Sequence, residues 1–203
     1  MKLEIIIKKI VTDDSLHAKW LNTLSLMENT GARKISAGEH PLDVTLIVLK
    51  HAAEEARHAF YLKKQIAKIR EKGFENYHFS ALLAPIHSYQ YLHTLDVATS
   101  RYLKKKLNLS GDKLRYGAYL LVTYAIEVRA DELYPVYQQI LETSGSKVNV
   151  KSIIMEEAGH LEEMKNQLQL FSPEWEQHAR EITNIENACF EKWVIALEKN
   201  CLA

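Results

Sequence analysis

The chain has 203 residues, of which 47% are apolar, so it is long enough to form one domain with a sizeable core. It contains only 7 glycines and 4 prolines, which favours long helices over many short strands. Its 26 basic residues balance its 26 acidic residues, and this neutrality argues against binding nucleic acid through bulk charge.

The cysteines and the apolar segments indicate a reducing compartment and no membrane contact. Cys189 and Cys201 do not form a Cys-x-x-Cys metal motif, and a chain of this size needs no disulfide. The segment 1–10 has too short an apolar run for a signal peptide or a membrane span, and no other segment reaches 18 apolar residues. We therefore expect a cytoplasmic protein that binds neither membrane nor nucleic acid.

Residues 1–12 contain three consecutive isoleucines, Ile5–Ile7. Because β-branched residues favour strands, this run predicts a short strand or an extended arm. Such an arm would pack on the body of the protein or on a second copy of the chain in a homodimer.

The first long helix is predicted over residues 13–39, because Asp13 begins a cluster of N-cap residues. Glu28 is the only charge on the apolar stripe of this helix. A buried carboxylate is costly unless it is paired or binds a metal, so Glu28 is a candidate ligand. One turn further on, Gly31 and Ala32 are small enough to leave space beside such a metal.

The next helix is predicted over 41–72, with Pro41 in its first turn and Gly73 as its stop signal. A further helix is predicted over 80–107, with Pro85 kinking its early turns. This helix would connect two helix pairs, because two pairs arranged about one pseudo-two-fold axis need a long crossover.

The second half of the chain predicts another helix pair, over 112–144 and 149–170, and then a C-terminal helix over 173–199. Pro135 lies inside the first of these helices and is expected to kink it. Pro173 is suited to the first turn of the last helix.

One motif occurs twice: residues 54–58 read Glu-Glu-Ala-Arg-His and residues 156–160 read Glu-Glu-Ala-Gly-His. Positions i and i+3 share a helix face, so the second glutamate and the histidine of each motif can bind one metal ion. Glu28 precedes Glu55 by 27 residues and Glu127 precedes Glu157 by 30, which indicates a duplicated helix pair. The candidate metal ligands are Glu28, Glu55, His58, Glu127, Glu157 and His160. Four glutamates and two histidines from four helices are the ligand set of a carboxylate-bridged dimetal bundle.

Four further residues are candidates for supporting roles around the ligands. A metal-bound histidine usually donates its other ring N–H to a carboxylate, a carbonyl or water. Glu54, Glu156 and Asp131 are placed to accept such a hydrogen bond, although solvated surface charge is an equally good interpretation of the two glutamates. His51 lies one turn before the first motif and is either a supporting group or, more commonly for such a residue, an ordinary core or surface histidine.

Two tyrosines are candidate catalytic residues. Tyr124 lies one turn before Glu127, and Tyr61 lies one turn after His58. Either side chain could line a reaction pocket, donate a hydrogen bond to a ligand or store an oxidising equivalent, but a tyrosine at helical spacing is more often a core residue.

The ligand set resembles that of the ferritin-like di-iron carboxylate superfamily, and the resemblance covers roughly residues 15–170. It implies an all-α, ferritin-like four-helix bundle with a helical crossover and an additional C-terminal helix, in a single domain over 1–203. It also implies that Glu55 and Glu157 bridge the metals. Ordinary ferritin lacks the full second Glu-x-x-His, and the cysteines here are too few for the four-cysteine iron site of rubrerythrin. The oxygen-activating members are therefore the better match.

The resemblance implies two iron ions, with manganese–iron or two manganese ions as alternatives, because mixed oxygen and imidazole ligands suit both metals. The leading hypothesis is an O2-dependent oxidoreductase, a monooxygenase, hydroxylase or oxidase of a small organic substrate, with O2 or peroxide as co-substrate and an electron-donor protein as partner. A ferroxidase or peroxide-removing protein without organic substrate is the second hypothesis, and a metal-free helical interaction module is the third. A wide apolar pocket would favour the first, and a narrow polar path to solvent the second.

Overall fold

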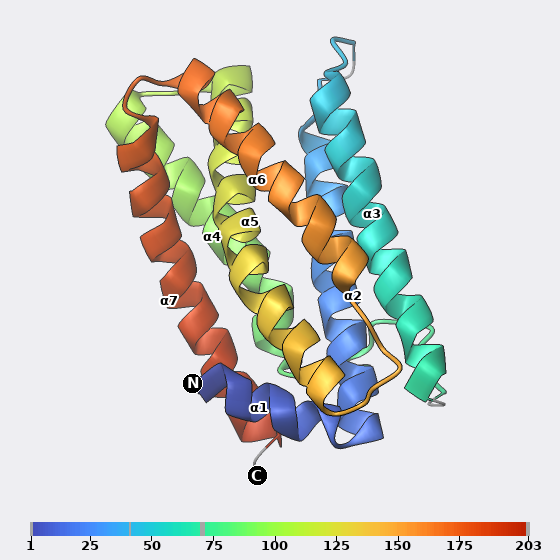
Figure 1. Cartoon of the computed structure of the whole chain (residues 1–203). Coiled ribbons are helices and arrows are strands. Elements are labelled where there is room, and N and C mark those ends of the chain that lie inside the picture. The colour runs from blue at the N-terminus through green and yellow to red at the C-terminus, as the bar shows by residue number, and fades with distance from the viewer. Residues whose placement is uncertain (1, 41, 70–71, 202–203) are drawn as a thin grey trace.

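The computed structural model describes residues 2–40, 42–69 and 72–201, and in these residues the chain is all-helical (Figure 1). The α-helices of the described residues are α1 (Lys2–Val11), α2 (Asp14–Gly38), α3 (Leu46–Ile66), α4 (Pro85–Leu107), α5 (Gly111–Thr143), α6 (Lys151–Phe171) and α7 (Trp175–Cys201). Two short 3-10 turns, η1 (Ala67–Ile69) and η2 (Phe79–Ala81), lie between α3 and α4. None of the helices in the described residues is long and apolar enough to cross a membrane.

The prediction of a strand or extended arm at residues 1–12 is wrong, because Lys2–Val11 form the helix α1, while residue 1 lies outside the described residues. Ile6, Ile7 and Ile10 share one helical face and are at most 1% exposed, while Ile5 points away from it. That face packs against α2, α5 and α7. The apolar area buried by an amphipathic helix therefore outweighs the preference of β-branched residues for strands.

The helix over 13–39 is confirmed, with the Asp13 side chain accepting the Leu16 N–H at 2.9 Å as its N-cap. The predicted start of the next helix at Pro41 lies outside the described residues, and α3 begins at Leu46. It ends at Ile66 instead of continuing to residue 72.

The starts of α4 and α7 also differ from those predicted. Pro85 is the first residue of α4, so it starts this helix and does not kink it. Residues 80–84, which were predicted to be helical, belong to η2 and to the turn that follows it. Helix α7 begins at Trp175, two residues after Pro173. Helix α5 runs without interruption past Pro135.

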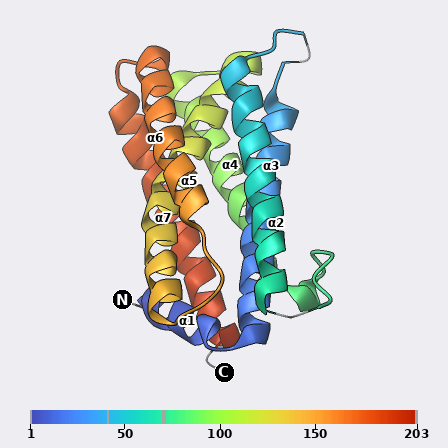
Figure 2. The same cartoon turned by 45° about the vertical axis from the view of Figure 1, so that its right-hand side comes forward.

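Helices α2 and α3 lie side by side, and so do α5 and α6 (Figures 1 and 2). Helices α4 and α7 pack on each other and on α5, while α1 lies across one end of the molecule beside the C-terminal end of α7. The described residues form two apolar clusters: Ile153 of α6 belongs to the one that includes α1, and Met164 of α6 belongs to the other. The second Glu-x-x-His motif lies between these two residues, so the polar site is placed between two apolar clusters.

Candidate metal centre

Four helices bring the predicted ligands to one place in the interior. Helix α2 supplies Glu28, α3 supplies Glu55 and His58, α5 supplies Glu127, and α6 supplies Glu157 and His160. The first group whose ligand atoms lie within 4.8 Å of one another comprises Glu28, Glu55, His58 and Glu157. The second comprises His51, Glu55, Glu127 and His160. All six sequence-predicted ligands therefore converge, and His51 joins them.

Glu157 and Glu55 occupy the shared positions of the cluster. Glu157 places Oε1 3.0 Å from His58 Nδ1 and Oε2 3.0 Å from His160 Nδ1, so one carboxylate faces the histidines of both motifs. Glu55 belongs to both groups of ligand atoms. The bridging role that the family resemblance implies for the two glutamates stays a prediction.

The first glutamate of each motif contacts the histidine of the other motif. Glu156 lies 2.8 Å from His58 Nε2, and Glu54 lies 2.9 Å from His160 Nε2. Arg57 makes an ion pair with Glu156. A carboxylate at Nε2 favours the tautomer with the proton on Nε2 and leaves the Nδ1 lone pair directed at the centre. Glu54 and Glu156 thus contact the two motif histidines, and their support of metal binding stays a prediction.

Burial and repulsion between neighbouring carboxylates shift the pKa values of several groups in this cluster. Burial and the neighbouring carboxylate of Glu55 hold the pKa of Glu28 well above its usual range, and burial and Glu157 do the same for Glu127. Burial opposes a charge on His160, but its hydrogen bond with Glu157 outweighs this and raises the pKa of His160 to about 9. In the absence of metal the site therefore retains protons that a cation would displace.

The donor atoms fit a pair of iron or manganese ions. His58 Nδ1 is buried and makes no hydrogen bond with any described residue, although a carboxylate oxygen lies 3.0 Å away. A buried nitrogen without a hydrogen bond is costly, and a cation would satisfy its lone pair. The four carboxylates and the imidazoles supply the oxygen and nitrogen ligands that these two metals prefer.

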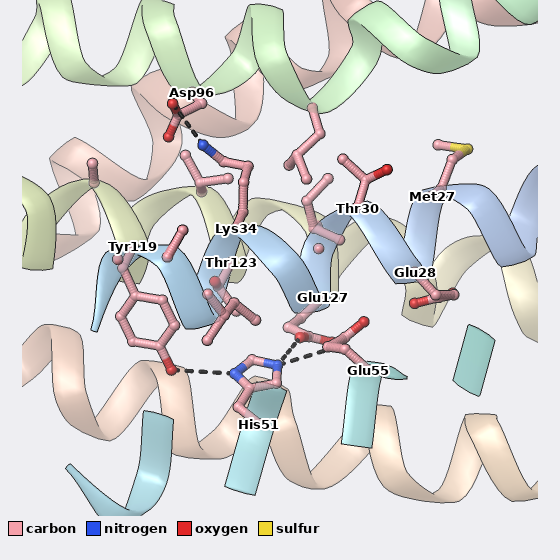
Figure 3. A pocket seen from close by; sticks show the side chains of 18 of the residues that line it. Met27, Glu28, Thr30, Lys34, His51, Glu55, Asp96, Tyr119, Thr123 and Glu127 are labelled. Atoms are coloured by element: carbon pink, nitrogen blue, oxygen red, sulfur yellow. Dashed lines mark hydrogen bonds and ion pairs between the residues drawn. The ribbon is translucent and has the colours of Figure 1, made fainter. Parts of the chain in front are cut away.

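A cavity of about 490 Å³ adjoins the cluster (Figure 3). Its inner wall includes Glu28, His51, Glu55 and Glu127. Most of the remaining wall is apolar, and an ion pair between Lys34 and Asp96, 2.6 Å apart and partly exposed, lies along it. Gly31 lines the cavity as predicted, and a Cβ on Gly31 would lie 3.6 Å from Glu55 Oε2. Ala32 is buried and is not among the described lining residues.

The two tyrosines predicted as catalytic residues lie away from the cluster. Tyr124 packs edge-on against Trp175 of α7, with ring centroids 6.1 Å apart, on the side of α5 that faces α7. The Tyr61 hydroxyl donates to the carbonyl of Asn149 at 3.0 Å. Neither tyrosine is among the described residues that line the cavity.

Two other tyrosines contact the cluster instead. The hydroxyl of Tyr134, which is 2% exposed, donates to Glu28 Oε1, and the hydroxyl of Tyr119 lies 3.2 Å from His51 Nδ1. Tyr134 lies seven residues after Glu127 on α5, and this two-turn spacing was the sequence signal that could have identified it.

Asp131, predicted to orient a ligating histidine, is exposed on α5. The outer nitrogens of His58 and His160 contact Glu156 and Glu54 instead. Asp131 is therefore not placed beside either histidine in the described residues.

Comparisons of the chain with protein-family models, with curated proteins and with solved structures find no match.

Proposed function

We propose that the protein is a ferritin-like four-helix bundle that holds two metal ions, in a single domain. In this proposal α2 with α3 and α5 with α6 form the two helix pairs, α4 is the crossover, and α7 is the additional C-terminal helix. The reciprocal contacts between Glu54 and His160 and between Glu156 and His58 support it, because they relate the two pairs as two halves of one site.

Six side chains would hold the metals. The predicted ligands are Glu28, Glu55, His58, Glu127, Glu157 and His160, with Glu55 and Glu157 in the shared positions. Two iron ions are proposed, with manganese in one or both positions as the alternative. When bound, such a pair supplies electrons for the reduction of O2. Cys189 and Cys201 are both free thiols, which supports a reduced, cytoplasmic setting.

We propose that the reaction is the O2-dependent oxidation of a small organic molecule. The observation that supports this is the cavity of about 490 Å³ whose mainly apolar wall includes four of the clustered carboxylates and histidines. Ligand pockets in proteins commonly measure about 300–1,000 Å³, so this volume suits a small substrate. A protein that only oxidises iron or removes peroxide needs no apolar space of this kind.

Residues of the chain itself perform the binding and positioning. The apolar wall excludes water from the bound molecule and strengthens electrostatic interactions in the site. Tyr134 donates a hydrogen bond to Glu28 and so fixes the orientation of that carboxylate toward the centre. Lys34 and Asp96 provide polar groups at a partly exposed part of the same wall.

Anaerobic loading with Fe(II), followed by rapid mixing with O2, tests the proposal. We expect two iron ions per chain, a transient visible absorption and O2 consumption that exceeds the iron present when a reductant and an organic substrate are supplied. Consumption limited to the iron present, whatever apolar molecule is added, would contradict an oxidase and favour the ferroxidase alternative. An external electron-donor protein would then be unnecessary.

A comparison of stability with and without metal distinguishes the oxidase and ferroxidase hypotheses from a metal-free interaction module. A metal that binds only the folded chain should raise its free energy of unfolding by about 2.7 kcal/mol at 100 times its dissociation constant. The double variant Glu55→Ala/Glu157→Ala should lose this increment, because it removes the two carboxylates in the shared positions. No metal-dependent increment in the wild-type chain would exclude the proposed site.

A further inference from the structure

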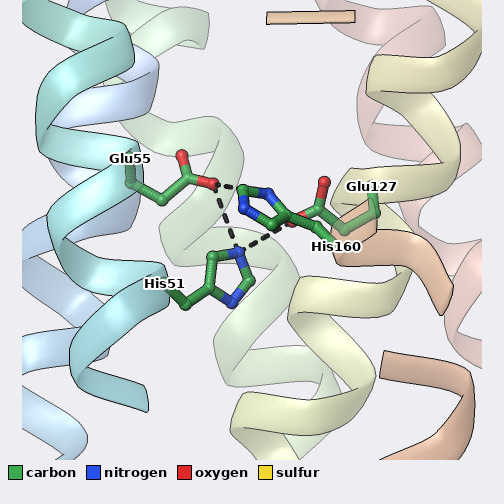
Figure 4. A group of neighbouring side chains, drawn as sticks. All are labelled: His51, Glu55, Glu127 and His160. Atoms are coloured by element: carbon green, nitrogen blue, oxygen red, sulfur yellow. Dashed lines mark hydrogen bonds and ion pairs between the residues drawn. The ribbon is translucent and has the colours of Figure 1, made fainter. Parts of the chain in front are cut away.

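His51 lies inside the ligand cluster and is 1% exposed (Figure 4). Its Nε2 atom is 2.9 Å from Glu127 Oε1 and 3.3 Å from Glu55 Oε1, and its ring centroid is 4.4 Å from that of His160. Atoms bound to one metal at about 2.0–2.2 Å lie roughly 3–4 Å from one another. The four side chains therefore have the spacing of ligands around a common ion.

The other nitrogen of His51 has its own partner outside the cluster. Nδ1 lies 3.2 Å from the hydroxyl oxygen of Tyr119, and the two rings pack edge-on with centroids 6.2 Å apart. When Nδ1–H donates to this oxygen, the lone pair of Nε2 is directed toward Glu127 and Glu55. A partner at the outer nitrogen is the usual arrangement for a histidine that binds a metal.

The two motifs differ at the position four residues before their second glutamate. His51 precedes Glu55 by four residues, and the residue that precedes Glu157 by four is Ile153, which is 1% exposed. The duplicated helix pair therefore carries an imidazole on one side of the centre and an apolar side chain on the other. Two metal ions bound at this centre would therefore have different surroundings.

We propose that His51 is a seventh metal ligand. One position would then be bound by two imidazoles, His51 and His160, together with Glu127, and the other by His58 and Glu28, while Glu55 and Glu157 keep the shared positions. This inference rests on the proposed dimetal function and specifies its coordination. Because imidazole suits iron better than manganese and carboxylate suits manganese, the His51 position selects iron more strongly than its neighbour does.

Cobalt(II) substitution of the full chain tests the ligand count without any assay of turnover. We expect two cobalt ions per chain and three strongly shifted, exchangeable ring N–H signals in the proton NMR spectrum, one for each bound histidine. His51→Gln should lose one signal and weaken one cobalt site by more than about 100-fold, beyond the 10–100-fold typical of losing an outer hydrogen-bond partner. Tyr119→Phe is the matched control and should keep all three signals while shifting only that of His51.

The outcomes separate this inference from the function on which it rests. A wild-type chain that binds no cobalt would overturn both. Two bound cobalt ions with only two shifted signals, and an unchanged spectrum in His51→Gln, would overturn the seventh ligand alone and leave His51 as a hydrogen-bond partner of Glu127. The wild-type signal count gives this answer even where the His51 variant fails to fold.

Discussion

Gly31 lies inside α2, where a glycine lowers helix stability, and it also lines the cavity beside Glu55. A Cβ added at Gly31 would make only an ordinary contact of 3.6 Å with Glu55 Oε2. Gly31→Ala should therefore raise the free energy of unfolding of the metal-free protein by about 0.8–1.0 kcal/mol, the difference in helix propensity between glycine and alanine. For a chain of this size that gain corresponds to a rise of about 2–4 °C in Tm.

Gly159 provides the matched control, because it lies inside α6, is exposed and would have no atom within 4 Å of an added Cβ. Gly159→Ala should give the same increase in Tm by differential scanning calorimetry. Gly31→Leu should lower the affinity of an apolar fluorescent probe by at least about 10-fold because it fills cavity space, whereas Gly159→Leu should leave it unchanged. A lower Tm for Gly31→Ala would refute the packing argument, and equal probe affinities in the two leucine variants would refute the placement of the binding site.

Replacing Glu54 or Glu156 by glutamine should weaken cobalt binding about 10–100-fold in a chelator competition, because each contacts the outer nitrogen of a predicted ligand; an unchanged affinity would contradict that role. Burial lowers the pKa of His17 from 6.5 to about 4, so its contribution to stability is complete above pH 6.5 and is lost as the pH falls toward 4, by up to about 3 kcal/mol. The free energy of unfolding, measured with urea across this pH range, should depend less on pH in His17→Gln than in the wild-type chain. An equal pH dependence in the two proteins would disprove the role of His17. Arg129 bonds both oxygens of Glu186, whose side chain is 1% exposed, so Arg129→Met should cost about 3–5 kcal/mol by leaving that buried charge without a cation, with the Tyr91 hydroxyl still donating to it. The double variant Arg129→Met/Glu186→Leu should recover part of this loss, because it removes the buried charge but leaves the Tyr91 hydroxyl without its acceptor. An equal loss in the two variants would show that the unpaired charge is not its cause.

The sequence by itself determined the helical class and identified the six candidate ligands. A helix repeats every 3.6 residues, so Glu55 and His58 must share a face, and so must Glu157 and His160. The isolated charge of Glu28 on an apolar stripe then needed a partner in the interior. These are properties of single helices, and they survive whatever tertiary arrangement the helices adopt.

Only the tertiary structure decided which neighbouring side chains face the site. His51 and Tyr124 both lie one turn from a predicted ligand, yet His51 points into the cluster and Tyr124 packs against Trp175. The rotation of each helix about its axis depends on the apolar area that it buries against all its neighbours, and the spacing within one helix does not contain that information. The same cause made α1 a helix, because Ile6 and its neighbours gain more by packing against three helices than their local strand preference costs.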